Sequence, residues 1–168
     1  MIYLREGLLT PSECEAVRGL FPPIQPATVN SPKSETRRSR TAFLTPAPHE
    51  NLCTMISTAL FTANKVFNFE IASLEPFQLA EYREGDFYDW HCDIGRGAMT
   101  RKLSASLQLT DPNEYDGGAL ELWGAAPINR TQGALLVFPS YTLHRVTPVT
   151  RGVRHSLVAW ATGTKPFR

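Results

Sequence analysis

Two side chains suited to metal binding stand two positions apart in the run Tyr88-Asp89-Trp90-His91-Cys92-Asp93. Side chains alternate between the faces of a β-strand, so His91 and Asp93 would project in one direction and Cys92 in the other. We therefore expect an imidazole and a carboxylate to reach the same ion.

A second histidine, His144, follows much later and could complete the ligand set after the break at Pro139. Two imidazoles and one carboxylate on one face of an ion leave its other positions open, and non-haem Fe(II) oxygenases use this arrangement. The remaining histidines are weaker candidates. His49 lies among prolines near an expected helix start, and His155 would lie on the opposite strand face from Arg154.

Arg154 and Ser156 are also two apart on an expected strand, so they share a face. An arginine pointing into an apolar barrel is costly unless an anion pairs with it. A small dicarboxylate held bidentately by the guanidinium, with Ser156 and Tyr82 adding hydrogen bonds, would meet that need. The alternatives are an ion pair with one of the protein's own acids and an arginine that faces solvent.

Length and composition indicate one globular domain. The chain has 168 residues and a formal net charge of +1, so no overall field favours nucleic acid or anionic lipid. Three widely spaced cysteines without a CxxC pair suggest neither a disulfide framework nor a cysteine zinc site. With no signal-peptide pattern and no long apolar run, we expect a cytoplasmic protein that is not inserted in a membrane.

The amino-terminal part predicts two helices. Thr10-Pro11-Ser12-Glu13 has the pattern of a capping box, which predicts the start of a helix that ends by Phe21. Apolar residues at helical spacing indicate a second helix from about Pro48 to Phe67. Residues 22–36 read as a surface loop, and residues 22–40 as a candidate lid over the site. We interpret the following cluster, Arg37-Arg38-Ser39-Arg40, as a solvated strand end, with substrate binding as the less favoured alternative.

After residue 70 the period becomes alternating and turn signals recur. Leu103 to Leu109 reads as a half-buried strand, and Ala119–Trp123, Ala134–Phe138 and His155–Trp160 read as further strands. We interpret Tyr88 and Trp90 as core residues, and only Tyr82 among the nearby aromatics as a ligand contact. The order favours two helices outside an antiparallel sandwich or barrel, with residues 1–70 as helical support and loop and residues 71–163 as the β core of one domain spanning 1–168.

Several runs together resemble the Fe(II)/2-oxoglutarate oxygenases, within them the prolyl-4-hydroxylase-like group and especially the bacterial PKHD-type hydroxylases. The resemblance covers about residues 78 to 163 closely and the Leu8 to Cys14 helix start more loosely. It rests on Tyr82 to Asp93, Arg101-Lys102-Leu103-Ser104, Tyr115 to Leu122, Phe138-Pro139-Ser140, and His144 to Val149 through Arg154 and Ser156. The chain ends at Arg168, soon after the last expected core strand. We therefore expect it to lack the carboxy-terminal extension of the longer PKHD-type proteins.

The resemblance implies a mainly β protein with flanking helices and a double-stranded β-helix, or jelly-roll, core. It implies His91, Asp93 and His144 as iron ligands, Arg154 on the distal carboxylate of 2-oxoglutarate, and Tyr82 and Ser156 beside that co-substrate. The implied cofactors are Fe(II), 2-oxoglutarate and O2, with ascorbate as a candidate reductant. The implied reaction hydroxylates an unactivated C–H bond and releases succinate and CO2.

The substrate is left open by the sequence. Family analogy favours a prolyl residue of a peptide or protein, and a free amino acid or other small molecule is the alternative. The charge balance argues against nucleic acid, and the oligomeric state is undetermined. Candidate entrance contacts are Trp123, Arg101 and Arg96, although Trp123 could equally be core. A non-catalytic metal-binding β-barrel is the rival from another class, and Arg154 with Ser156 argues against it.

Overall fold

The computed structural model describes residues 1–19, 25–26, 35–44, 47, 49–95, 97–128 and 130–167. It has two helices, α1 (Pro11–Gly19) and α2 (Glu50–Phe67). The strands that precede β6 are β1 (Tyr3–Arg5), β2 (Gln25–Pro26), β3 (Arg37–Arg38), β4 (Arg40–Phe43) and β5 (Ser73–Leu74). The others are β6 (Gln78–Tyr82), β7 (Phe87–His91), β8 (Arg101–Gln108), β9 (Tyr115–Gly117), β10 (Leu120–Leu122), β11 (Leu135–Pro139), β12 (His144–Val146), β13 (Val149–Gly152) and β14 (Arg154–Thr162).

Both predicted helices are confirmed, and each has a local reason for where it begins or ends. At the start of α1 the Glu13 carboxylate accepts a hydrogen bond from the Thr10 backbone N–H at 2.7 Å, and the Glu13 N–H donates to Thr10 Oγ1 at 3.3 Å. This is the predicted capping box. The last turn of α2 is closed by Asn68 in the left-handed conformation, with φ of 56°. Neither helix combines the length and apolar character that crossing a membrane requires, as far as the described chain extends.

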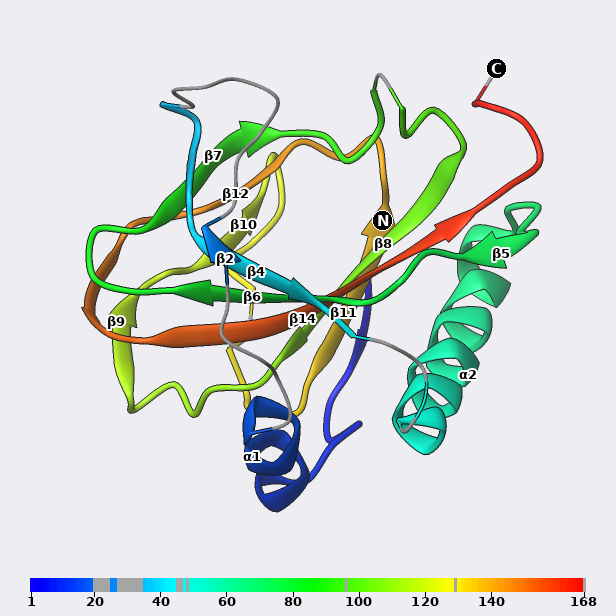
Figure 1. Ribbon diagram of the computed structural model, residues 1–168. Helices are drawn as coiled ribbons and strands as arrows, with labels where there is room; N and C mark the ends of the chain where they lie inside the picture. The colour runs from blue at the N-terminus through cyan, green and yellow to red at the C-terminus, as the bar shows by residue number, and fades with distance from the viewer. Residues whose placement is uncertain are drawn as a thin grey trace.

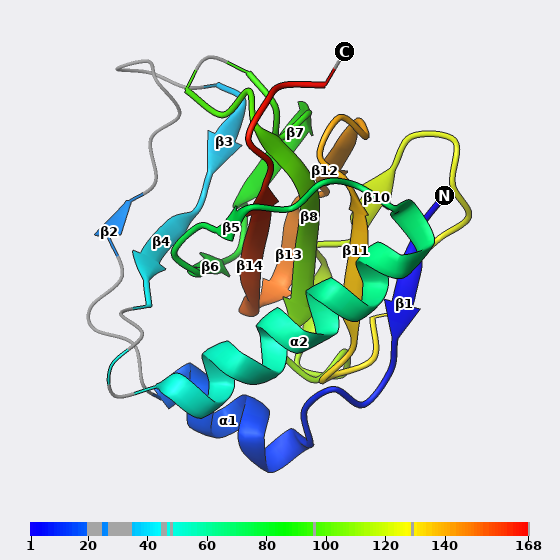
Figure 2. The same cartoon turned by 90° about the vertical axis from the view of Figure 1, so that its right-hand side faces the viewer.

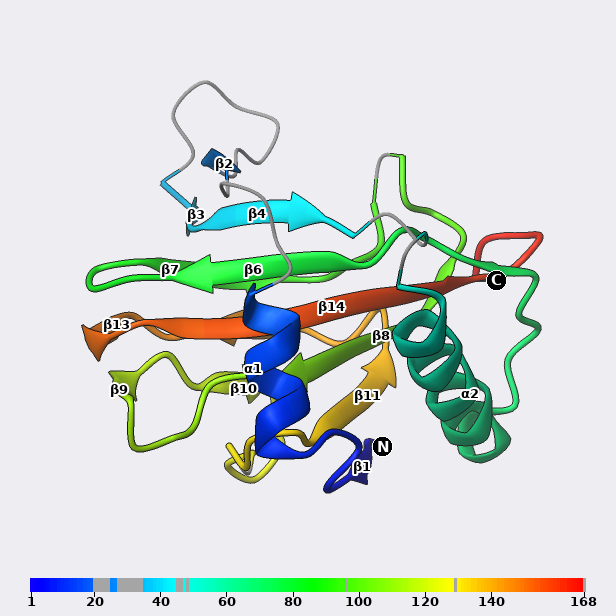
Figure 3. The same cartoon turned by 60° about the horizontal axis from the view of Figure 1, so that its bottom comes forward.

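The larger sheet has eight antiparallel strands in the order β1-β11-β8-β14-β6-β4-β2, with β5 added beside β14. Figure 1 shows the whole arrangement, and Figure 3 shows β4, β6, β14, β8 and β11 side by side in this order. The long strands β8 and β14 form the centre of this sheet and pair over most of their length.

One face of the larger sheet is apolar and packs against the helices. Figure 2 shows α2 lying across the sheet, with α1 beside it. Side chains from every second position of β8 and β14 meet Ile56, Leu60 and Ala63 of α2 there. The sheet residues in this core are Leu79, Leu103, Ala105, Leu107, Leu135, Val137, Leu157, Ala159 and Ala161.

A second sheet of four strands, in the order β10-β12-β7-β3, lies over the other face. A cavity lined by residues of both sheets lies between them. The two-stranded sheet of β9 and β13 completes the β structure. The two facing antiparallel sheets confirm the predicted mainly β jelly-roll core with flanking helices.

The amino-terminal 70 residues contribute more than the expected helical support. They supply β1, β2 and β4 to the larger sheet and β3 to the smaller one. These strands have two to four residues, too few to show an alternating pattern in the sequence. Within the expected loop at 22–36, Gln25–Pro26 forms β2, while most of that loop lies outside the described residues. Of the candidate lid at 22–40, the described end from residue 35 onward includes β3 and the first residue of β4.

Candidate metal centre

His91, Asp93 and His144 come together at one end of the cavity between the sheets. His91 is the last residue of β7, and His144, the first residue of β12, is its direct partner across the antiparallel pair. Asp93 lies beyond the strand, in the turn that follows β7, where its backbone N–H donates to Ser140 O at 2.9 Å. The expectation that His91 and Asp93 share a regular strand was therefore wrong, although both side chains point into the cavity at the metal centre.

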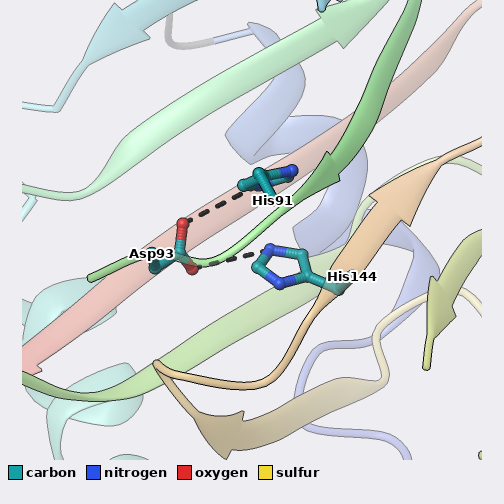
Figure 4. A group of neighbouring side chains, drawn as sticks. All are labelled: His91, Asp93 and His144. Carbon is teal, nitrogen blue, oxygen red and sulfur yellow. Dashed lines mark ion pairs between the residues drawn. The ribbon is translucent and has the colours of Figure 1, made fainter. Parts of the chain in front are cut away.

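The three side chains have the spacing of a metal site. One ligand atom from each residue lies within 4.8 Å of the other two. His91 Nε2 is 3.8 Å from Asp93 Oδ1, and His144 Nε2 is 3.6 Å from Asp93 Oδ2; Figure 4 shows both imidazoles turned toward the carboxylate. Two nitrogen ligands and one oxygen ligand suit a non-haem Fe(II) ion with open positions, so this donor set fits the metal that the resemblance implies.

The tautomers of both histidines favour metal binding. His91 Nδ1 is 2.7 Å from Asp89 O, and His144 Nδ1 is 2.8 Å from Thr142 O. A carbonyl only accepts, so each Nδ1 carries a hydrogen, and in the neutral form of each ring the lone pair is then on Nε2. Burial, and then repulsion from His144, lowers the pKa of His91 to about 4, so its imidazole is neutral at pH 7.

The Asp93 carboxylate is oriented by hydroxyl groups that the sequence did not single out. Ser104 Oγ donates to Asp93 Oδ2 at 2.6 Å, and Ser140 Oγ lies 3.0 Å from Ser104 Oγ. Ser104 and Ser140 are both buried. Such outer partners fix the direction of a ligand carboxylate. The sequence did hold a signal for this role, because serines alternate with apolar residues along β8. If that polar face is buried, its hydroxyls need hydrogen-bond partners.

Arg154 lies in the same cavity and has no acidic partner among the described residues. Only 3% of this residue is exposed, and its described contacts are Ser156 Oγ, 3.5 Å from Nη1, and the Tyr82 ring, 5.6 Å from the guanidinium carbon. A buried cation with neutral neighbours is stabilised by a ligand anion. The cavity, of about 250 Å³, therefore suits the second group that the resemblance implies, a small dicarboxylate.

Gly118 makes room for this arginine. It has a φ of +57°, and a Cβ at that position would lie 3.1 Å from Arg154 Cδ and 2.9 Å from Val149 Cγ2. The Asp116-Gly117-Gly118 run was read from the sequence only as a turn signal. The structure shows that its second glycine also allows the stem of Arg154 to pass close to the backbone.

A β-bulge brings Tyr88 to the metal centre. Between His144 and Val146 of β12 there are two steps, whereas their partners His91 and Tyr88 on β7 are three apart. The extra residue turns Tyr88 onto the side of His91, where the two rings stack with centroids 3.4 Å apart. Tyr88 packs, half-buried, against a small core cluster that includes Tyr82, so its interpretation as core is confirmed in part. It also lines the cavity, which strict alternation could not anticipate because of the bulge.

The other expected entrance residues have different surroundings. Trp123 is 68% exposed and makes an edge contact with Trp90, which is half-buried outside the cavity, so neither belongs to the buried core. Arg101 lines the cavity and binds Glu75 with two hydrogen bonds of 2.8 and 2.6 Å. His155 contacts Glu81 at 3.2 Å, away from the metal centre. Arg96 lies outside the described residues.

The sequence of this region matches a known family. Residues 77–162 fit the profile of the 2OG-Fe(II) oxygenase superfamily, which is half of the chain. The chain belongs to the 2OG-Fe(II) oxygenase superfamily. All three residues of the metal centre and Arg154 lie inside the matched segment of this oxygenase.

Curated relatives of this oxygenase include PKHD-type hydroxylases, as the resemblance predicted. One from Teredinibacter turnerae is 42% identical over 94 residues, covering 51% of this chain and 42% of the relative. The PKHD-type hydroxylase YbiX of Escherichia coli is 40% identical over 88 residues, covering 47% of this chain and 39% of the relative. The matching segment thus spans less than half of the length of these relatives.

Solved structures share the fold over nearly the whole chain. A prolyl-4-hydroxylase from Pseudomonas putida superposes with a TM-score of 0.76 at 22% identity and covers 96% of this chain and 92% of its own. A viral collagen prolyl hydroxylase from Paramecium bursaria Chlorella virus-1 gives 0.76 at 20% identity, covering 97% and 96%. At these identities the likeness shows the jelly-roll fold of the oxygenase and nothing more.

Proposed function

We propose that this protein is an Fe(II)- and 2-oxoglutarate-dependent dioxygenase that hydroxylates an unactivated C–H bond. The observation that carries the proposal is the unpaired buried cation of Arg154 in the same cavity as His91, Asp93 and His144. A protein that merely stores a divalent ion would not need a cation placed to receive a dicarboxylate. Membership of the oxygenase superfamily supports the same reading.

In this proposal the cofactors supply the oxidising chemistry: Fe(II), O2 and 2-oxoglutarate yield succinate, CO2 and an oxygen atom for the substrate C–H bond. The residues bind and orient. His91, Asp93 and His144 would hold the metal through Nε2, a carboxylate oxygen and Nε2, while Ser104 keeps the Asp93 carboxylate in place. Arg154 would bind the distal carboxylate of the keto acid bidentately.

Tyr82 and Ser156 would complete the co-substrate site beside Arg154. Both are buried and both line the cavity. Tyr82 is paired with Arg154 across β6 and β14, and Ser156 lies one step further along the same face of β14. Each carries a hydroxyl that can hydrogen-bond to a carboxylate. We assign them the role of fixing the tilt of the keto acid.

We propose a prolyl residue of a peptide or protein as the substrate. Two observations support this choice. The PKHD-type relatives are hydroxylases, and a prolyl hydroxylase from Trichoplax adhaerens, solved with a peptide fragment of the hypoxia inducible factor oxygen degradation domain, superposes with a TM-score of 0.77 at 16% identity. The second candidate is a free amino acid or other small molecule, and a carboxylate on such a molecule could pair with Arg37, which lines the same cavity.

The test needs no knowledge of the substrate. Under argon, 2-oxoglutarate is titrated into the Fe(II)-loaded protein while the visible charge-transfer absorption of a bidentate keto-acid chelate is followed. We expect a saturable band in the wild type and an affinity about 10–100-fold weaker in Arg154→Ala, because charge-assisted hydrogen bonds are lost. Arg151→Ala, which removes an exposed arginine paired with Asp116, is the matched control and should leave the titration unchanged.

Two outcomes would contradict the proposal. Bound Fe(II) without any band on adding 2-oxoglutarate would indicate a non-catalytic metal-binding barrel. A band of unchanged affinity in Arg154→Ala would remove the role of that residue. Succinate release with candidate prolyl peptides, absent in His144→Ala, then tests turnover and the prolyl assignment.

A further inference from the structure

Three arginines line the cavity, and they differ in how their charge is balanced. Arg101 is neutralised by both carboxylate oxygens of Glu75, whereas no side chain in the described part of the chain neutralises Arg154 or Arg37. All 16 aspartates and glutamates lie in the described ranges, and none of them forms an ion pair with Arg37 or Arg154. One of these two free charges, that of Arg154, is used by the proposed co-substrate.

Arg37 is held in the cavity by neutral groups. It is half-buried on β3 opposite Tyr88, and its guanidinium carbon lies 4.6 Å from the centre of the Tyr88 ring, which in turn stacks on His91. Nε donates to Ser39 Oγ at 2.7 Å, and one terminal nitrogen reaches Gln78 Oε1 at 3.4 Å. A guanidinium has five N–H donors, so donors are left for a ligand beside the metal centre.

Arg37 and Arg154 lie toward opposite ends of the cavity. Gln78, the partner of Arg37, pairs with Val158 across β6 and β14, while Tyr82, which faces Arg154, is four residues away along β6. At about 3.3 Å per residue this places about 13 Å between the two positions along the strand. A keto acid held by Arg154 and the metal would therefore leave Arg37 to another molecule.

A second unsatisfied donor marks the Arg37 end. Trp160 lies two residues beyond Val158 on the same face of β14, lines the cavity and is 7% exposed. Its indole Nε1 is buried and has no hydrogen-bond partner among the described residues. The Arg101 guanidinium carbon lies 3.9 Å from the centre of the Trp160 ring, and Arg37 lines the same cavity. Buried polar groups are normally satisfied, so an orphan N–H in a cavity that also holds an unpaired cation indicates a missing ligand that carries acceptor oxygens.

The charges of the proposed site point the same way. A divalent ion and Arg154 together carry three positive charges, and Asp93 with a dianionic keto acid carries three negative charges. Those groups balance one another, and the charge of Arg37 is left over. A substrate with one carboxylate near the target C–H bond would neutralise it, whereas a neutral substrate would not.

We infer that the Arg37 end of the cavity is the substrate subsite and that it selects substrates bearing a carboxylate, which Arg37 binds while the Trp160 indole N–H donates to a further acceptor oxygen. This inference rests on the proposed oxygenase function and deepens it. The carboxylate can be the free α-carboxylate of an amino acid or peptide end, or an acidic side chain next to the target residue. Arg37 would thus be a specificity-determining residue.

The test measures binding without turnover, by calorimetry on protein loaded with Mn(II) and 2-oxoglutarate under argon. Two matched probe pairs separate the sources of the carboxylate. One pair is acetyl-Ala-Pro as free acid and as amide, and the other is acetyl-Ala-Pro-Asp-amide and acetyl-Ala-Pro-Asn-amide. Free proline and prolinamide form a third pair for the amino-acid alternative. We expect at least one acid to bind about 10-fold or more tightly than its neutral counterpart.

Substitutions assign the preference to Arg37. In Arg37→Gln the ratio of acid to amide affinity should fall to about one. In Arg37→Lys, which keeps the charge but loses the planar bidentate donor geometry, the preference should be partly retained. If Arg37 served only to pack against Tyr88, the substitution would weaken the binding of acid and amide equally and leave the ratio unchanged. Arg38→Gln, an exposed neighbour on the same strand, is the charge-matched control and should behave like the wild type.

The failures are distinguishable. If no acid is preferred over its amide, or if the preference survives in Arg37→Gln, the inference is overturned while the oxygenase assignment stands. If 2-oxoglutarate itself does not bind to the metal-loaded protein in an Arg154-dependent way, the proposed function fails first. Melting temperatures of the variants, measured before titration, show whether each of them is folded.

Discussion

The two faces of the larger sheet have opposite chemistry, although the same strands supply both. On β8, Leu103, Ala105 and Leu107 enter the core beneath α2, and the intervening Ser104 and Ser106 line the cavity. On β14, Leu157 and Ala159 alternate in the same way with Arg154 and Ser156. The helix-covered face contributes stability by burying apolar area, whereas the cavity face carries polar groups that are available to bind ligands. Stability and function should therefore be separable residue by residue.

The largest effect is expected where the cavity face holds the metal. Asp93→Ala removes one of three ligands, so the affinity for Mn(II) or Fe(II) should fall by more than the roughly 10–100-fold that loss of an outer partner costs. The melting temperature of the metal-free protein should change little. Calorimetry with Mn(II) and thermal unfolding in chelator measure the two quantities. A metal affinity close to that of the wild type would show that the ion binds elsewhere.

Adjacent residues of β8 provide the sharpest test of the comparison between faces. Leu107 is fully buried under the helices, and Leu107→Ala should lower the free energy of unfolding by about 2–5 kcal/mol. Ser106→Ala, one residue away on the cavity face, should change it by less than about 1 kcal/mol. Denaturant unfolding of both variants measures the difference. Equal destabilisation would mean that the two faces are not energetically distinct.

Ser104 lies on the cavity face but acts through a metal ligand. Removing its hydroxyl in Ser104→Ala loses the 2.6 Å hydrogen bond to Asp93 Oδ2, so the Mn(II) affinity should fall by about 10–100-fold. Ser104→Thr, which keeps the hydroxyl, is the conservative control and should recover most of the affinity. If alanine at this position left metal binding intact, the carboxylate would be oriented by other groups.

The smallest expected effect is a gain in stability, whereas the preceding substitutions are expected to reduce affinity or stability. Arg154→Met keeps an apolar stem and removes a buried charge that no described acidic residue pairs with, so the ligand-free protein should gain roughly 1 kcal/mol of stability. The same substitution should abolish the further stabilisation that 2-oxoglutarate gives to the metal-loaded wild type. Thermal unfolding with and without the keto acid tests both statements. A loss of stability in the ligand-free variant would show that Arg154 is structurally paired after all.

Elements with a strong local signal were predicted well. The capping box of α1, the helical spacing of α2 and the alternation of β8 and β14 each depend on residues close in sequence. The short strands β1 and β2 were missed, and β3 and β4 were anticipated only as a strand end at Arg37 to Arg40, because all four form by pairing with strands distant in the sequence. The expected cytoplasmic location and the division of the chain at residue 70 stay predictions.

The sequence by itself determined which groups are available: two histidines, one aspartate and an inward-facing arginine on strands whose period fixes their face. Only the tertiary structure decided which of them are neighbours and which lack partners. The bulge that turns Tyr88 onto His91, the Glu75 carboxylate that neutralises Arg101, and the unpaired charge of Arg37 all depend on segments distant in the chain. Local periodicity sets the direction of a side chain, but whether a charge is balanced depends on everything that packs around it.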